Sequence, residues 1–119
     1  MPALTAALDG LWMADAEGAR KVERAEALRV LSQTKVILLN APVLGAKLGH
    51  GDIAGLDLLE LFAFTHPAVF AVPTIIGMAD ALGMARPDGG AEEAGALRRM
   101  AATLLSIMAR DDWTARSGA

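Results

Sequence analysis

Residues 35–40, Lys-Val-Ile-Leu-Leu-Asn, form the clearest strand signal in the chain and decide its fold class. A continuous run of β-branched residues and leucine is typical of a strand that is buried on both faces. Asn40 can cap a helix directly after this strand, and Pro42 fits the first turn of that helix because its missing N–H costs little there. We expect this helix to continue to Leu48 and to stop at Gly49.

Two weaker strands and a helix are expected before this segment. Residues 11–14, Leu-Trp-Met-Ala, form a short apolar run, and residues 19–22 can pair back with it across a turn at residues 15–18. Residues 23–33 then change to the spacing of an amphipathic helix. These elements predict a hairpin followed by a helix with one apolar face.

Two further helices are expected after residue 50. Asp57 is a good N-cap for residues 58–65, which are apolar almost all round and are therefore predicted to be buried. A short extended piece is expected at residues 69–72. Thr74 can then cap a helix that Gly83 closes.

Residues 92–110 form the longest predicted helix, and they follow a linker rich in Pro and Gly at residues 85–90. Acidic residues at the start of this helix and Arg110 at its end match the helix dipole. We interpret residues 111–119 as the start of a linker toward an absent part of the protein. Residues 1–110 would then form one domain.

Strands interleaved with helices predict an α/β fold. We expect a small mixed sheet of about three strands, covered by helices. Such a sheet is thin for a chain in which 54% of the residues are hydrophobic.

The composition excludes several classes of protein. With 21% charged residues and 54% hydrophobic residues, the chain is too apolar to be a disordered tail. It has no Cys, which excludes a disulfide scaffold, thiolate metal ligands and a Cys nucleophile. Its net charge of −3 lacks the basic excess that is usual for a protein that grips nucleic acid along its own surface.

No membrane segment or targeting signal is evident. The longest stretch without Asp, Glu, Lys or Arg is residues 61–79, and Pro67, Pro73 and Gly77 interrupt it. Residues 1–11 lack the basic start and the long apolar run of a signal peptide. We therefore expect a cytoplasmic protein with no membrane partner.

Asp15 and Glu17 are the first candidate site residues, because they directly follow a predicted strand. Two carboxylates at the end of a strand can hold Mg²⁺, a hard cation that prefers oxygen ligands. The alternative is a solvated hairpin turn that ends in Gly18, and an isolated Asp-x-Glu pair favours this simpler interpretation. We assign no metal ligand, and Asp15 and Glu17 stay candidates for a catalytic role.

His66, Arg98 and Arg99 are candidates for contacts with nucleic acid or with a protein partner. His66 precedes Pro67 at a predicted helix end, where its ring can cap carbonyl groups or face a groove. The two arginines can contact phosphate, although such residues more often form a solvated helix face.

The segment from Val36 to Met84 resembles the middle of a DnaQ-like 3′–5′ exonuclease domain, which has a ribonuclease H-like fold. In that family a strand ends in His-Asn-Ala, a later segment begins with Asp-Thr-Leu, and a helix ends in Leu-Gly before a linker. Asn40-Ala41, Asp57-Leu58 and Leu82-Gly83 occur here in the same order. The resemblance implies a truncated exonuclease-like fold.

A closer resemblance, over roughly residues 8 to 115, is to the N-terminal region of DinG-type ATP-dependent DNA helicases of alphaproteobacteria. It rests on residues 39–42, Leu-Asn-Ala-Pro, on residues 55–64, Gly-Leu-Asp-Leu-Leu-Glu-Leu-Phe-Ala-Phe, and on residues 70–74, Phe-Ala-Val-Pro-Thr. Such helicases carry their P-loop and other motor motifs after this region. The resemblance implies that this chain is the N-terminal piece alone.

Departures from the exonuclease pattern imply that nuclease activity is lost. Leu39 stands where the family has His, and Val43 and Leu44 stand where it has an Asp. Arg99 stands near the position at which the closing helix of the family carries a metal-binding Asp. Two-metal hydrolysis needs several carboxylates, and a guanidinium group repels a metal cation. The resemblance therefore implies no cofactor in this chain, with Mg²⁺ and ATP bound by the helicase motor.

The resemblance implies a non-catalytic N-terminal accessory domain of a helicase that acts in DNA repair or replication. Such a domain would dock on the motor of the same polypeptide or position single-stranded DNA. Two alternatives stay open. One is a weak metal-dependent 3′–5′ exonuclease that uses Asp15 and Glu17, and the other is a free-standing protein-interaction module.

Overall fold

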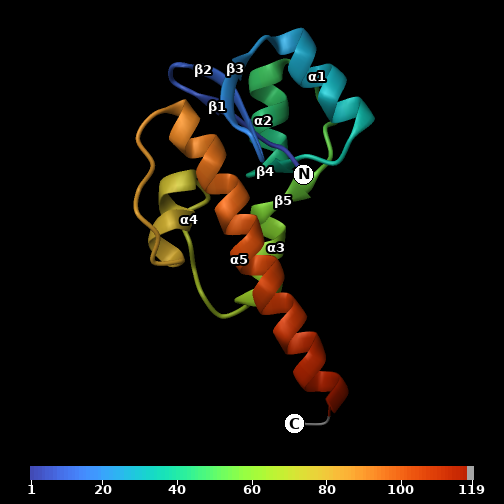
Figure 1. The fold of residues 1–119 in the computed structure, drawn as a ribbon, viewed down its shortest axis with the longest axis vertical. Helices are drawn as coiled ribbons and strands as arrows, with labels where there is room; N and C mark the ends of the chain where they lie inside the picture. Colours follow the sequence, from blue (N-terminus) through green and yellow to red (C-terminus); the bar gives the residue numbers. More distant parts are fainter. Residues whose placement is uncertain (118–119) are drawn as a thin grey trace.

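The computed structural model describes residues 1–117 and has an α/β architecture, in which helices cover both faces of an open mixed sheet (Figure 1). In this part of the chain the sheet has five strands in the order β3-β2-β1-β4-β5. The strands are β1 (Ala3–Ala7), β2 (Gly10–Asp15), β3 (Gly18–Val22), β4 (Ile37–Leu38) and β5 (Leu56–Asp57).

The helices follow the strands in two groups. They are α1 (Arg24–Gln33), α2 (Ala41–Leu48), α3 (Leu58–Thr65), α4 (Ile75–Ala81) and α5 (Gly90–Ser117). Helix α5 runs across the sheet, and its carboxyl-terminal turns extend away from it (Figure 1). The first three strands form an antiparallel meander, whereas β4 and β5 are parallel to β1. The carboxyl ends of β1 and β4 therefore lie at the same edge of the sheet.

Each face of the sheet has its own core. On one face Ala3 and Ile37 pack against buried residues of α3, α4 and α5. On the other face Leu4 and Leu38 pack against buried residues of α1 and α2. Neighbouring residues on a strand point to opposite faces, so both strands are buried on both sides.

Local chemistry sets the helix ends, as the sequence predicts. Asn40 caps α2, Asp57 caps α3 and Thr74 caps α4, each through a side-chain oxygen that accepts a backbone N–H. Gly49 ends α2 in the left-handed conformation, with a φ of 69°. Because Gly has no Cβ, it adopts this conformation without steric cost, and the carbonyl groups at the end of the helix obtain hydrogen-bond partners.

The expected number of strands is wrong: residues 1–117 form five strands rather than about three. Strand β1 was not predicted because its residues, Ala-Leu-Thr-Ala-Ala, have low intrinsic strand preference, and only pairing with β2 and β4 makes them a strand. Strand β5 was not predicted because two residues leave no periodic pattern. The strand expected at residues 35–40 forms only at Ile37 and Leu38.

Two more expectations differ from the structure. Residues 69–72 form no strand. Helix α3 is not buried all round, because Phe62 is 4% exposed whereas Phe64 is 71% exposed.

The end of the predicted domain lies inside a helix. Helix α5 continues without a break past Arg110 to Ser117, so residues 111–117 of the expected linker are helical. The last two residues of that expectation, 118 and 119, lie outside the described residues. None of the described helices has the length and apolar character needed to cross a membrane.

Candidate functional site

A cavity of about 610 Å³ lies at the carboxyl edge of β1 and β4, and we refer to it as the edge cavity. Its walls are aliphatic and come from the ends of both strands, from α2 and from residues 73–76 before and within α4. Its polar lining consists of Thr5, Asn40, Lys47, Thr74 and Glu93. In open α/β sheets, ligands bind outside the carboxyl ends of strands, where connections leave in opposite directions. Here the connection that follows β1 leads to β2 on one side, and the connection that follows β4 leads through α2 to β5 on the other side.

Asn40 forms part of the cavity wall in an unusual backbone conformation. Its φ of 66° and ψ of 76° lie in the left-handed region, and it is the one non-glycine residue of the described chain with a positive φ. Asn tolerates this conformation better than most residues do, because its short polar side chain bonds locally. Its Oδ1 accepts the N–H of Val43 at 3.4 Å.

Asp57 holds Asn40 in this conformation. Its Oδ1 accepts the N–H of Asn40 at 2.9 Å and that of Leu59 at 3.0 Å, and its Oδ2 accepts the N–H of Ala41 at 2.8 Å. Both carboxylate oxygens are used, and the residue is only 8% exposed. Asp57 therefore fixes the backbone between β4 and α2 and between β5 and α3, from a position behind the cavity wall.

Lys47 and Glu93 bring opposite charges to the edge cavity. Lys47 comes from the last turn of α2, and its Nζ donates to the carbonyl oxygen of Ala6 at 3.4 Å. Glu93 comes from the first turn of α5. Partial burial raises the pKa of Glu93, the charge on Asp9 raises it further, and Lys47 acts in the opposite direction.

Lys47 and Glu93 were not predicted as site residues from the sequence. A Lys in the last turn of a helix and a Glu in the first turn are ordinary partners of the helix dipole, so neither stands out. One feature of the sequence could have pointed to Lys47. It follows Val43 and Leu44 by about one turn on the helix that Asn40 begins, so it lies on the same side of that helix as they do.

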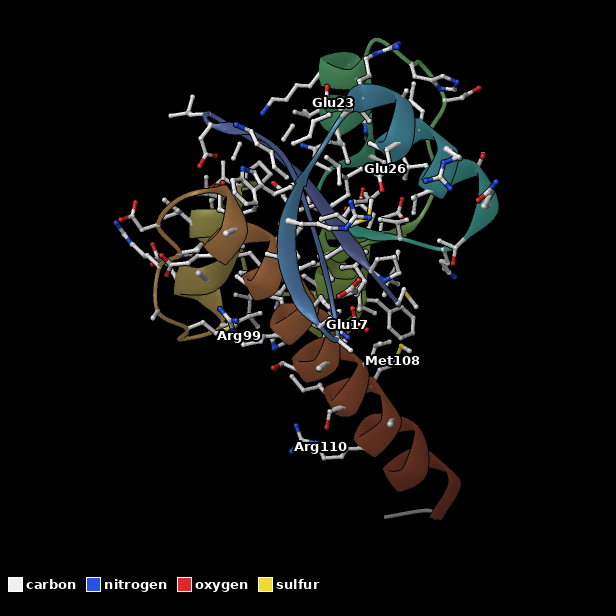
Figure 2. The ribbon with its side chains drawn as sticks, turned by 45° about the horizontal axis from the view of Figure 1, so that its top comes forward. Glu17, Glu23, Glu26, Arg99, Met108 and Arg110 are labelled. Atoms are coloured by element: carbon white, nitrogen blue, oxygen red, sulfur yellow. The ribbon has the colours of Figure 1, made fainter. Side chains whose placement is uncertain are left out.

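The structure places Asp15 and Glu17 away from Asn40 and Asp57. They lie on the turn between β2 and β3, where the N–H of Glu17 donates to Asp15 Oδ1 at 2.8 Å. This is the local geometry of a hairpin turn stabilised by an Asp side chain. Figure 2 shows Glu17 at the end of this hairpin, with Arg99 on α5.

A second cavity, of about 480 Å³, brings Asp15 together with Arg98 and Arg99 between the β2–β3 hairpin and α5. Arg98 also binds the chain terminus, because its Nε donates to the carbonyl oxygen of Met1 at 3.3 Å. Glu92 and Asp15 add negative charge to this lining, so the two arginines do not form a purely basic patch.

His66 lies at the end of α3, as its position before Pro67 predicts. Its ring stacks on Phe62 with the centroids 4.7 Å apart, and its Nδ1 is 2.8 Å from the hydroxyl of Thr65. These contacts give His66 a structural role at the helix end.

The charged residues of the edge cavity are therefore Glu93 and Lys47. The carboxylate of Asp57 accepts backbone N–H groups, and Asp15 lines the other cavity. Among the residues that the structure describes, no three His, Asp or Glu side chains converge in a way that could hold a metal ion. The chain matches no protein-family model, no curated protein and no solved structure.

Proposed function

We propose that this chain is a non-catalytic accessory domain of an ATP-dependent DNA helicase, built on an exonuclease-like fold. It would dock on the helicase motor or help to position single-stranded DNA. The proposal combines the resemblance of residues 39–74 to DinG-type helicases with the arrangement of charges in the edge cavity.

The topology of the sheet supports the exonuclease-like part of the proposal. Three antiparallel strands are followed by two strands parallel to the first, in the order β3-β2-β1-β4-β5. A small mixed sheet of this kind agrees with the exonuclease-like fold that the resemblance implies. Helix α1 leads from β3 to β4 and α2 leads from β4 to β5, and both lie on the face of the sheet opposite α5 (Figure 1).

The composition of the edge cavity is the observation that carries the loss of catalysis. Two-metal hydrolysis requires several carboxylates around a pair of cations that lie about 4 Å apart. Among the described residues Glu93 is the one carboxylate in the lining, and the ammonium group of Lys47 would oppose a metal ion there. At the strand ends, Leu4, Ala6 and Leu39 present no ligand atoms in their side chains.

A nuclease assay tests this conclusion directly. We expect the purified chain to leave 5′-labelled single-stranded DNA intact in the presence of Mg²⁺ or Mn²⁺. Metal-dependent degradation that is lost in Asp15→Ala or in Glu93→Gln would overturn the proposal and favour the weak exonuclease.

The coding sequence tests the helicase part. We expect the reading frame to continue past codon 119 into a P-loop of the form Gly-x-x-x-x-Gly-Lys. A stop codon directly after Ala119 would contradict docking on a motor of the same polypeptide.

Exposed apolar side chains favour a protein-interaction module as the second candidate. Four such side chains are largely exposed: Phe64 in the last turn of α3, and Val69, Phe70 and Val72 between α3 and α4. A cluster of exposed large apolar residues is typical of a surface that contacts a partner. Sedimentation of the purified chain tests whether this segment causes self-association.

A further inference from the structure

The edge cavity combines saturated hydrocarbon walls with two oppositely charged side chains. Leu39, Val43, Leu44 and Ile76 contribute to the walls, and no aromatic ring belongs to the described lining. Nucleic-acid bases are usually bound by stacking on aromatic side chains, so these walls suit an aliphatic group better than a base. The volume of about 610 Å³ lies in the range of small-molecule sites.

The two charged side chains of the cavity are not paired with each other. The ion pairs formed in the described part of the chain are Arg20–Glu26, Arg29–Glu26 and Arg86–Asp80. Lys47 makes only the long contact to the Ala6 carbonyl oxygen, which leaves donors of its ammonium group available. The carboxylate of Glu93 keeps its acceptor positions. The cavity therefore offers separate sites for a negative and a positive group.

Neutral polar groups complete the lining. Thr5 is 7% exposed and forms no side-chain hydrogen bond within the described residues. Thr5 is one of the residues that line the cavity. Asn40 adds a residue in a sparsely populated backbone region, a feature that is concentrated at binding and catalytic sites.

We propose that the edge cavity binds a small aliphatic zwitterion, namely a free amino acid such as leucine or a short peptide of such residues. Its carboxylate would contact the Lys47 ammonium group, and its ammonium group would contact the Glu93 carboxylate. Its hydrocarbon side chain would lie against Leu39, Val43 and Ile76. The proposal does not depend on the helicase assignment, because it uses only the geometry of this cavity.

A ligand series tests each half of the recognition by calorimetric titration and by the shift in melting temperature. The probes are L-leucine, leucyl-leucine, N-acetyl-leucine, leucinamide and glycine. We expect leucine or leucyl-leucine to bind. N-acetyl-leucine lacks the ammonium group and leucinamide lacks the carboxylate, so each should bind at least about tenfold more weakly. Glycine carries both charges without the hydrocarbon and should also lose about tenfold.

Substitutions in the chain test the same contacts. Lys47→Met and Glu93→Gln should each weaken binding by at least about tenfold, and Lys47→Arg should retain most of it. Lys35→Met and Glu92→Gln are matched controls, because Lys35 is exposed and Glu92 lines the other cavity. Circular dichroism verifies that each variant is folded.

Three results would overturn the proposal. These are no binding of either zwitterion at about 10 mM, equal binding of N-acetyl-leucine, or unchanged binding by both Lys47→Met and Glu93→Gln. Failure of the nuclease assay or of the reading-frame test would leave these titrations unaffected, so the two proposals stand or fall separately.

Discussion

The carboxylate of Asp57 accepts the backbone N–H of Asn40 at 2.9 Å, although the two residues are 17 positions apart in the chain. The same carboxylate caps α3 through the N–H of Leu59. One side chain thus joins the end of β4 to the start of α3 and supports the wall of the edge cavity. It performs this role from a position that is almost fully buried.

Replacing Asp57 should weaken the fold strongly. In Asp57→Asn an amide NH₂ group replaces one carboxylate oxygen, so a backbone N–H at Asn40 or Ala41 faces another donor. Because the substitution weakens hydrogen bonds to a charged group and the N-cap of α3, it should lower the free energy of unfolding by about 2–4 kcal/mol. Urea unfolding measures the loss, with the exposed Asp52→Asn as a control that should change little. Equal effects of the two substitutions would contradict the role of Asp57.

The left-handed backbone at Asn40 predicts unequal losses of stability for two small substitutions. Asn40→Ala should lose about 1–2 kcal/mol, because alanine resists a φ of 66° and cannot cap α2. Asn40→Gly should lose much less, because glycine adopts this conformation freely. Thermal unfolding of both variants compares them, and a glycine variant that is less stable than the alanine variant would argue against backbone strain.

The two neighbouring phenylalanines of α3 should differ sharply in their contribution to stability. Phe62 is buried and stacks on His66, so Phe62→Ala should cost about 3–5 kcal/mol. Phe64 is exposed, so Phe64→Ala should change the free energy of unfolding by less than about 0.5 kcal/mol. Urea titration of the pair checks this contrast. A large loss from Phe64→Ala in the isolated chain would show that its side chain is covered in solution.

Close packing at the start of α5 predicts that Gly90 cannot be replaced by alanine without cost. A Cβ at Gly90 would collide with the indole ring of Trp12, which also donates from Nε1 to Asp9 at 3.1 Å. Gly90→Ala should cost about 1–3 kcal/mol and should alter Trp fluorescence. At Gly51 a Cβ meets nothing within 4 Å, so Gly51→Ala is the matched control and should be nearly neutral. Unchanged fluorescence in Gly90→Ala would contradict the contact.

Glu93 predicts a pH dependence of stability with a defined sign. Its folded pKa is raised by partial burial and by the charge on Asp9, so the folded chain holds this proton more tightly than the unfolded chain does. The free energy of unfolding should therefore decrease as the pH rises from the ordinary carboxyl range, about 4, through the raised pKa. The measurement is the difference between the wild type and Glu93→Gln in urea unfolding at several pH values. If the stability of the wild type relative to Glu93→Gln increased with pH, the prediction would be contradicted.

Helix ends could be predicted from the sequence because their chemistry is local. The caps at Asn40, Asp57 and Thr74 depend on a side chain and a backbone N–H only two or three residues away. The hairpin turn at Asp15 is equally local. In each case a short window of sequence contains all the atoms involved.

The central strand and the edge cavity could not be predicted because they depend on distant segments. β1 is an alanine-rich stretch that becomes a strand only through its pairing with β2 and β4. The hydrogen bond between Asp57 and Asn40 joins two residues that the sequence presents as separate caps. Lys47 and Glu93 line the same cavity only because the end of α2 and the start of α5 lie at the same edge of the sheet.

The coverage of β1 by α5 has a consequence for synthesis on the ribosome. Of the five described strands the central one, β1, is made first, and the buried residues that cover one of its faces, from Ala96 to Leu104, follow only after β2 to β5 have been made. At a synthesis rate of about 5–20 residues per second, the apolar face at Ala3 and Ile37 stays uncovered for several seconds until α5 has been made. Until then a nascent chain exposes hydrophobic surface and cannot complete its core. Translation rate and chaperone access should therefore affect the yield of this protein more strongly than they affect proteins whose first strands are covered early.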